Sequence, residues 1–219
     1  MIGNGKALSM VAAVALIGVV SWQAWSRSGA TASPAEYFGD AVAELSADDG
    51  TAVAVVNGVS IPQSKVRAFL VFHSAGVTLT PDNQPRSVQE YVEMLVETEL
   101  MFQEAQRRGL VPSDEEVVAM ARQQKQVLLD FLSQDTPEAH EARAWADQLK
   151  GTDYHPEVDD TRQVMLDGWR RTMAVGLLRG EIMKTLSPDV LADLEKREAA
   201  FKQYAAELRK AADVQVLVK

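Results

Sequence analysis

The residues from Ala7 to Trp25 form an almost unbroken apolar run that contains no charged side chain. A helix rises about 1.5 Å per residue, so this run extends about 28 Å, close to the hydrocarbon thickness of a bilayer. A chain that begins this way is either anchored in a membrane or exported across one. We therefore expect the rest of the chain to fold outside the cytoplasm.

Two interpretations of this segment stay open: an uncleaved anchor and a cleaved signal peptide. Ala30-Thr31-Ala32 matches the A-x-A pattern of a cleavage site, but it lies well beyond the end of the apolar run. Trp22 and Trp25 are typical of the aromatic belt where an anchor leaves the membrane, which favours the anchor. Because Lys6 precedes the run, we expect a single-pass protein with its amino terminus in the cytoplasm.

Composition excludes several classes of function. The chain has no cysteine, which excludes thiol catalysis and cysteine metal sites and suits an oxidising compartment. Its 31 acidic side chains outnumber the 22 basic ones, which gives a net charge of −9, and no basic patch is visible. We therefore expect no binding of nucleic acid.

Three segments are predicted along the chain: a membrane anchor over 1–25, a flexible linker over 26–50 and a helical domain over 51–219. The linker is rich in Ser, Ala, Gly and acidic residues, with room for one short helix around Tyr37 to Leu45. At the start of the domain, Asn57-Gly58 separates two β-branched runs between Ala52 and Ile61. This is a strong hairpin signal, because both turn residues tolerate a positive φ.

Helical spacing of apolar residues, together with capping residues, predicts helices over most of the remaining domain. They cover about 64–75, 87–108, 113–132, 136–151, a stretch that begins after 156, and 187–211. Val214 to Val218 alternates as a strand does. Because an isolated hairpin is marginal in water, we expect it to pair with this last strand. The predicted fold is mostly α with a small antiparallel β-ribbon, preceded by one transmembrane helix.

The order of these motifs resembles a known family. Val55-Val56-Asn57-Gly58, the long helix Leu95 to Leu110 and the capping motif in Pro112 to Glu116 are similar to the SurA-like, PpiD-like and PrsA-like chaperone domain of the parvulin foldases. Leu208 to Leu217 resembles the closing helix and strand of that family. The resemblance covers about 52–120 and 195–218. It implies a chaperone of the bacterial inner membrane, with its domain in the periplasm, that binds unfolded or nascent exported proteins.

The catalytic module of that family, a parvulin prolyl isomerase, has no counterpart in this chain. The interval 135–185 is too short for it and is predicted to be helical, and His140 and His155 do not fit its paired-histidine pattern. We therefore expect no enzyme, no catalytic residue and no cofactor, with residual isomerase activity as an unfavoured alternative. A further alternative is a dedicated assembly or structural subunit of a single membrane complex.

Apolar residues on the predicted helices are the candidate binding residues. Methionine thioethers adapt to irregular partners, so a methionine-rich surface suits many unfolded segments, although each methionine could instead fill a gap in the core. We expect an apolar peptide-binding groove lined by Tyr91, Met94, Leu95, Met101, Met165, Trp169 and Met173.

The stretch from His155 to Asp160 is the nearest thing to a metal or acid-base cluster in the sequence. Such a set could bind a divalent cation. However, acidic residues in a first helical turn after Pro156 also stabilise the helix against its macrodipole, which explains the pattern without a metal. His73, near the end of an apolar helix, is interpreted as a packed residue. We predict no metal site.

Overall fold

The computed structural model describes residues 40–41, 43–44, 47, 50–74, 87–151 and 163–218, apart from the side chains of 72–74, 141, 145, 148, 164 and 165. The predicted anchor Ala7 to Trp25, most of the predicted linker, the stretch His155 to Asp160 and the side chain of His73 lie outside this description. None of the helices within these ranges combines the length and the hydropathy that a membrane span requires.

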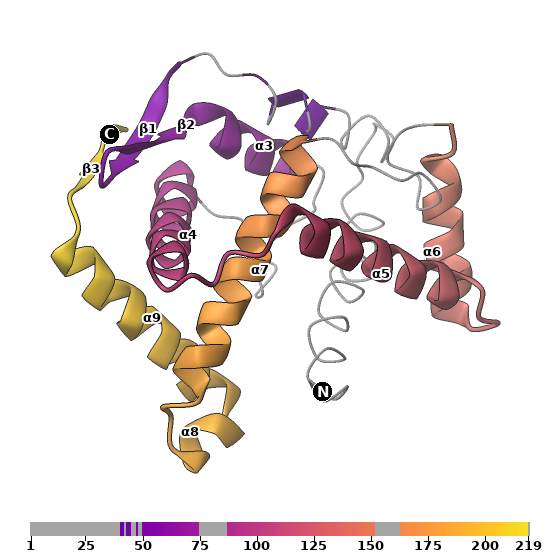
Figure 1. Cartoon of the computed structure of the whole chain (residues 1–219). Coiled ribbons are helices and arrows are strands. Elements are labelled where there is room, and N and C mark those ends of the chain that lie inside the picture. The colour runs from indigo at the N-terminus through magenta and orange to yellow at the C-terminus, as the bar shows by residue number, and fades with distance from the viewer. Residues whose placement is uncertain are drawn as a thin grey trace. The chain divides into compact units, whose positions relative to one another are not determined.

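The described chain is mostly helical, with one small sheet (Figure 1). In chain order the elements are β1 (Ala52–Val56), β2 (Val59–Pro62), α3 (Gln63–Ser74), α4 (Val88–Arg107), α5 (Asp114–Leu132), α6 (Pro137–Gln148), α7 (Gln163–Met183), α8 (Pro188–Ala192), α9 (Leu194–Ala211) and β3 (Val214–Val216).

The elements divide into two compact units. Of the described residues, those within 1–47, 67–85 and 118–162 belong to unit 1, and those within 48–66, 86–117 and 163–219 belong to unit 2. Unit 2 therefore holds the whole sheet together with α4, α7, α8 and α9.

The sheet confirms the predicted pairing of the hairpin with the last strand. It is antiparallel, in the order β2-β1-β3, and Ala54 and Val56 lie opposite Val216 and Val214. The hairpin turns at Asn57 and Gly58, whose φ angles are 50° and 81°. Two consecutive positive φ angles define the type I′ turn, whose twist matches that of the strands it joins.

One face of the sheet is apolar and packs on α4. Opposite residues of antiparallel strands share a face, so Ala54, Val56 and Ile61 lie on the same side as the half-buried Val214 and Val216. The first three are at most 2 % exposed, and β1 contacts α4. In Figure 1 the sheet lies above α4.

Helix α4 is the central element of unit 2, in contact with β1, α7 and α9. It begins with a capping box, in which the Ser87 hydroxyl accepts from the Glu90 amide and the Glu90 carboxylate accepts from the Ser87 amide. After α4 the chain reverses at Gly109, which has a φ of 69°. The main apolar cluster consists of Met101, Phe102, Ala105, Ala174, Leu178, Ile182, Phe201 and Ala205.

The prediction of one helix over 187–211 is wrong, because the helix is interrupted at Asp193. This residue has an extended backbone (φ −111°, ψ 120°), and its Oδ1 accepts from the amides of Glu195 and Lys196 at 2.9 and 3.2 Å. Aspartate favours such capping over a helix interior, so α8 ends and α9 starts again at this position.

In unit 1, the turn between α5 and α6 is closed by side chains. The Thr136 hydroxyl caps α6 by accepting from the Ala139 amide at 3.2 Å, and Arg143 donates to the carbonyls of Leu132 and Gln134. The end of the predicted linker also packs within this unit: Ala41 is fully buried, and Glu44 pairs with Arg67 at 2.6 Å.

Candidate functional site

Of the seven predicted binding residues, two are buried in the core of unit 2. Tyr91 and Met101 are 1 % and 5 % exposed, so the prediction that they line a peptide groove is wrong. The reason is that the sheet, α7 and α9 all contact α4, and together they cover apolar residues on several of its sides. Met94 and Leu95, on the same helix, are half-buried.

Helix α7 carries a partly open apolar surface of unit 2. Trp169, Met173 and Leu177 follow one another at intervals of four residues and so lie on one side of the helix. We call these three residues the α7 stripe. Trp169 and Met173 are half-buried and Leu177 is 50 % exposed. The side chain of Met165, on the same helix, lies outside the description.

The buried side of α7 is distinct from this stripe. Ala174, Leu178 and Ile182, also four residues apart, are at most 6 % exposed and belong to the main apolar cluster. The helix is therefore apolar on two sides, only one of which the core of unit 2 uses. Leu177 was not among the predicted binding residues, although its spacing from Trp169 and Met173 is the signal that identifies it.

Further exposed leucines lie where α8 meets α9. Leu191 is 38 % exposed and Leu194 is 64 % exposed. Neither of them belongs to the main apolar cluster, to which α9 contributes Phe201 and Ala205 from its later turns. These leucines form a second, smaller apolar surface of unit 2.

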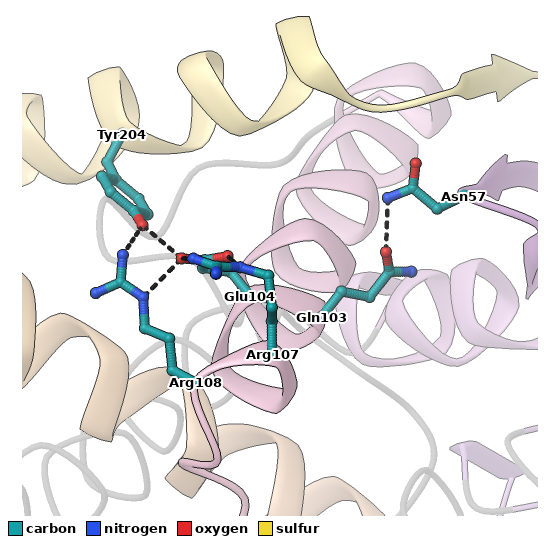
Figure 2. Close-up of polar contacts among 6 residues, drawn as sticks. All are labelled: Asn57, Gln103, Glu104, Arg107, Arg108 and Tyr204. Atoms are coloured by element: carbon teal, nitrogen blue, oxygen red, sulfur yellow. Dashed lines mark hydrogen bonds and ion pairs between the residues drawn. The ribbon is translucent and has the colours of Figure 1, made fainter.

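Polar side chains fix the end of α4 to α9, as Figure 2 shows. The Glu104 carboxylate accepts from Nε of Arg107 and Nε of Arg108, at 2.7 and 2.6 Å. It also accepts from the Tyr204 hydroxyl of α9 at 3.0 Å, and Arg108 donates to the same hydroxyl at 2.5 Å. All four residues thus form one closed hydrogen-bonded group.

This group has a marked effect on ionisation. Hydrogen bonds, first from Arg107 and then from Arg108 and Tyr204, lower the pKa of Glu104 to about 2, although burial opposes the shift. Burial, together with the neighbouring Glu104, raises the pKa of Tyr204. Glu104 is therefore a carboxylate at neutral pH and Tyr204 a hydroxyl that donates to it.

A second polar group fixes the hairpin turn to α4 and β3. Asn57 Nδ2 donates to Gln103 Oε1 at 2.8 Å (Figure 2), and Gln103 Nε2 donates to the Val56 carbonyl at 3.0 Å. On the other side, Asn57 Oδ1 accepts from the Asp213 amide at 2.9 Å, and the Asn57 amide donates to the Asp213 carbonyl at 2.8 Å. One turn residue thus bonds both to α4 and to the residue that precedes β3.

A third polar group lies between α4 and α7. Glu99 is 5 % exposed and accepts from Arg171, whose guanidinium also lies over the Phe102 ring, 4.3 Å from its centroid. Burial and the nearby Arg171 charge lower the pKa of Lys65, at the start of α3, against the opposing effect of Glu99 and Asp167.

These three groups hold elements together and offer no evident reaction chemistry. Each buried carboxylate is engaged by guanidinium groups, so neither Glu99 nor Glu104 is placed as a free general base. In the part of the chain that the structure describes, no group of three or more His, Cys, Asp or Glu could hold a metal ion. What unit 2 offers a ligand is apolar surface and the backbone edges of its sheet.

Comparison of the chain with protein-family models, with curated protein sequences and with solved structures gave no match. The resemblance to the SurA-like chaperone domain therefore stays a prediction.

Proposed function

We propose that this chain is a chaperone-like protein that binds unfolded or partly folded exported polypeptides, without isomerase activity and without a cofactor. Its amino-terminal apolar segment tethers it to the bacterial inner membrane, and the body faces the periplasm. The observation that supports this proposal most directly is the α7 stripe, because a helix that is apolar outside its core contacts offers a surface to apolar segments of another chain.

Two further features agree with this proposal. The first and last strands of unit 2, which lie in the two stretches that the resemblance covers, pair in one sheet. The net charge of −9 keeps a protein with exposed leucines soluble. A chaperone that holds unfolded chains needs both exposed apolar surface and solubility. Such a chain binds the unfolded state of another protein. It thereby lowers the concentration of unbound, unfolded protein that can aggregate.

The test is suppression of aggregation. The full-length chain is added to several unrelated proteins diluted from denaturant, and light scattering is followed. We expect suppression of aggregation for most of them. The Leu177→Gln variant is expected to suppress it less, because glutamine suits a helix but removes apolar surface from the α7 stripe.

Val88→Gln is the matched control. Val88 is 44 % exposed, close to the 50 % of Leu177, but it lies at the start of α4 and outside the α7 stripe. Equal loss in both variants would show that exposed apolar area in general, rather than the α7 stripe, binds the client. No suppression by the unmodified chain would disprove the chaperone proposal.

A dedicated assembly subunit of one membrane complex is the second candidate function. It is favoured if crosslinks from the α7 stripe give one repeated product in cells, whereas a chaperone gives a spread of exported chains. A residual prolyl isomerase predicts faster cis–trans exchange in a proline peptide, and we expect no acceleration.

A further inference from the structure

The two outer edges of the sheet differ in what they offer to another backbone. On β3, the bonds from the Asn57 amide to the Asp213 carbonyl and from the Leu217 amide to the Val53 carbonyl show which groups face β1. Hydrogen bonding alternates along an antiparallel strand, so Gln215 also faces β1. The N–H and C=O groups of Val214 and Val216 therefore point away from the sheet.

These four groups are unpaired within the described residues. β3 is the last strand in the order β2-β1-β3, and none of the described backbone or side-chain groups bonds to Val214 or Val216 on that side. In Figure 1, β3 lies at the margin of the sheet, on the side of β1 away from β2. The edge thus presents two donors and two acceptors in the spacing that an extended chain matches.

The opposite edge is blocked. Val59 is paired with Val56 across the two-residue turn, so Ser60 is the next residue whose N–H points outward. The following outward position is Pro62, which has no N–H to donate. Proline at an edge is a common protection against strand addition, and β3 carries none.

The side chains beside the open edge select what can bind there. Val214 and Val216 are half-buried and share the face of Ala54 and Val56, so the apolar face of the sheet continues to its open margin. A strand placed next to β3 sets alternate side chains on this face, and apolar residues at every second position suit it. The other face carries the exposed Gln215 and Leu217, so it accepts polar and apolar side chains alike.

We infer that the outer edge of β3 is a binding site for an extended polypeptide segment with apolar residues at alternate positions, which adds to the sheet as a fourth strand. This inference rests on the proposed function and names one site through which a client is held. The net charge of −9 favours a neutral or basic client segment over a second copy of this chain, because two copies repel each other.

The experiment measures binding of a fluorescent peptide of alternating Val and Thr with one terminal Lys to the full-length chain, by anisotropy. The Val216→Pro variant removes an outward N–H and leaves the groups that pair with β1 in place. We expect the Val216→Pro variant to bind the peptide about five- to tenfold more weakly. The variant loses one backbone hydrogen bond to the peptide, and the proline ring keeps the peptide backbone from approaching β3 closely. Ser60→Pro, which removes the outward N–H of the opposite edge, is the matched control and should bind as the unmodified chain does.

A second measurement needs no variant of the protein, so it stands even if Val216→Pro does not fold. The same peptide is N-methylated at every second residue, so one of its two backbone edges has no N–H donor. When this edge faces β3, we expect the peptide to bind at least fivefold more weakly than the unmethylated peptide. Hydrogen exchange of the Val214 and Val216 amides should slow when the unmethylated peptide is added.

Three outcomes overturn the inference: equal binding by Val216→Pro, equal binding of the methylated peptide, or protection of the two amides that depends on protein concentration without peptide. The last would mean that a second copy occupies the edge. If any of these occurs while the chain still suppresses aggregation, the proposed function stands and the client binds elsewhere. If aggregation is not suppressed at all, the proposed function itself fails.

Discussion

Glu104 is the residue on which the polar contact between α4 and α9 depends most. Its pKa is about 2 in the folded chain, against an ordinary 4.5, so ionised Glu104 stabilises the fold. That stabilisation is complete above about pH 4.5 and is lost as the pH falls from about 4.5 to about 2. At about 1.4 kcal/mol per pKa unit it is at most about 3.5 kcal/mol, and solvent screening of the exposed Arg107 partner lowers this value.

We therefore predict that Glu104→Gln unfolds more easily than the unmodified chain at pH 6, and that most of this difference disappears by about pH 2. The free energy of unfolding, from urea titrations at both pH values, measures this. The other carboxyl groups titrate in both proteins, so only the difference between them reports Glu104. A difference that does not change with pH would contradict the assignment.

Asn57 combines two roles that substitution can separate. Its φ of 50° is left-handed, and its side chain bonds to Gln103 and to the Asp213 amide. We predict that Asn57→Gly, which keeps the turn and removes both bonds, lowers the free energy of unfolding by about 1–2 kcal/mol. Asn57→Ala should lose about 1 kcal/mol more, because alanine also strains the turn. Equal losses in urea titrations would show that the backbone angle matters little.

At the scale of the element, the separation of α8 from α9 depends on one cap. We predict that Asp193→Ala lowers the free energy of unfolding by about 1 kcal/mol, because the amides of Glu195 and Lys196 lose their acceptor. Asp193→Asn is the matched control and should cost little, since asparagine caps equally well. If both variants behave alike in thermal unfolding, the break in the helix does not depend on this side chain.

The elements most accurately predicted from the sequence are those with a local physical signal at each end. Asn57-Gly58 fixes the hairpin, and Ser87 and Gly109 bound α4, because caps and positive φ angles act within a few residues. Asp193 carries the same kind of signal, but it lies inside a continuous apolar period and was interpreted as part of a helix. At Asp193, the hydrogen bonds of the capping side chain decide the backbone conformation, rather than the helical spacing of the apolar residues around it.

The prediction that Tyr91 and Met101 line the groove is wrong for a different reason. Periodicity shows that Tyr91 and Met101 lie on apolar sides of α4, but not that neighbouring elements cover those sides. Which side of a helix stays open is decided by its partners, and these come from distant parts of the chain. The spacing of Trp169, Met173 and Leu177 shows that they share one side of α7, but spacing alone does not show how exposed each of them is.

At the scale of the whole molecule, unit 2 is complete only when the end of the chain is in place. We predict that a chain ending at Asp213, without β3, loses its cooperative thermal unfolding transition or has a strongly lowered midpoint, because β1 then lacks a partner along one edge. A chain ending at Leu217 keeps the bond to Val53 and is the control. Similar midpoints for the two truncated chains would show that β3 contributes little.

The antiparallel pairing of β1 with β3 also determines how unit 2 responds to mechanical force. Ala52 begins β1 and Val216 ends β3 beside Ala54, so the incoming and outgoing chain leave the sheet at the same end. Tension applied between them loads the hydrogen bonds one after another, as in unzipping, rather than all together in shear. Pulling on the chain from both directions therefore peels β3 away at low force while the helices are still packed.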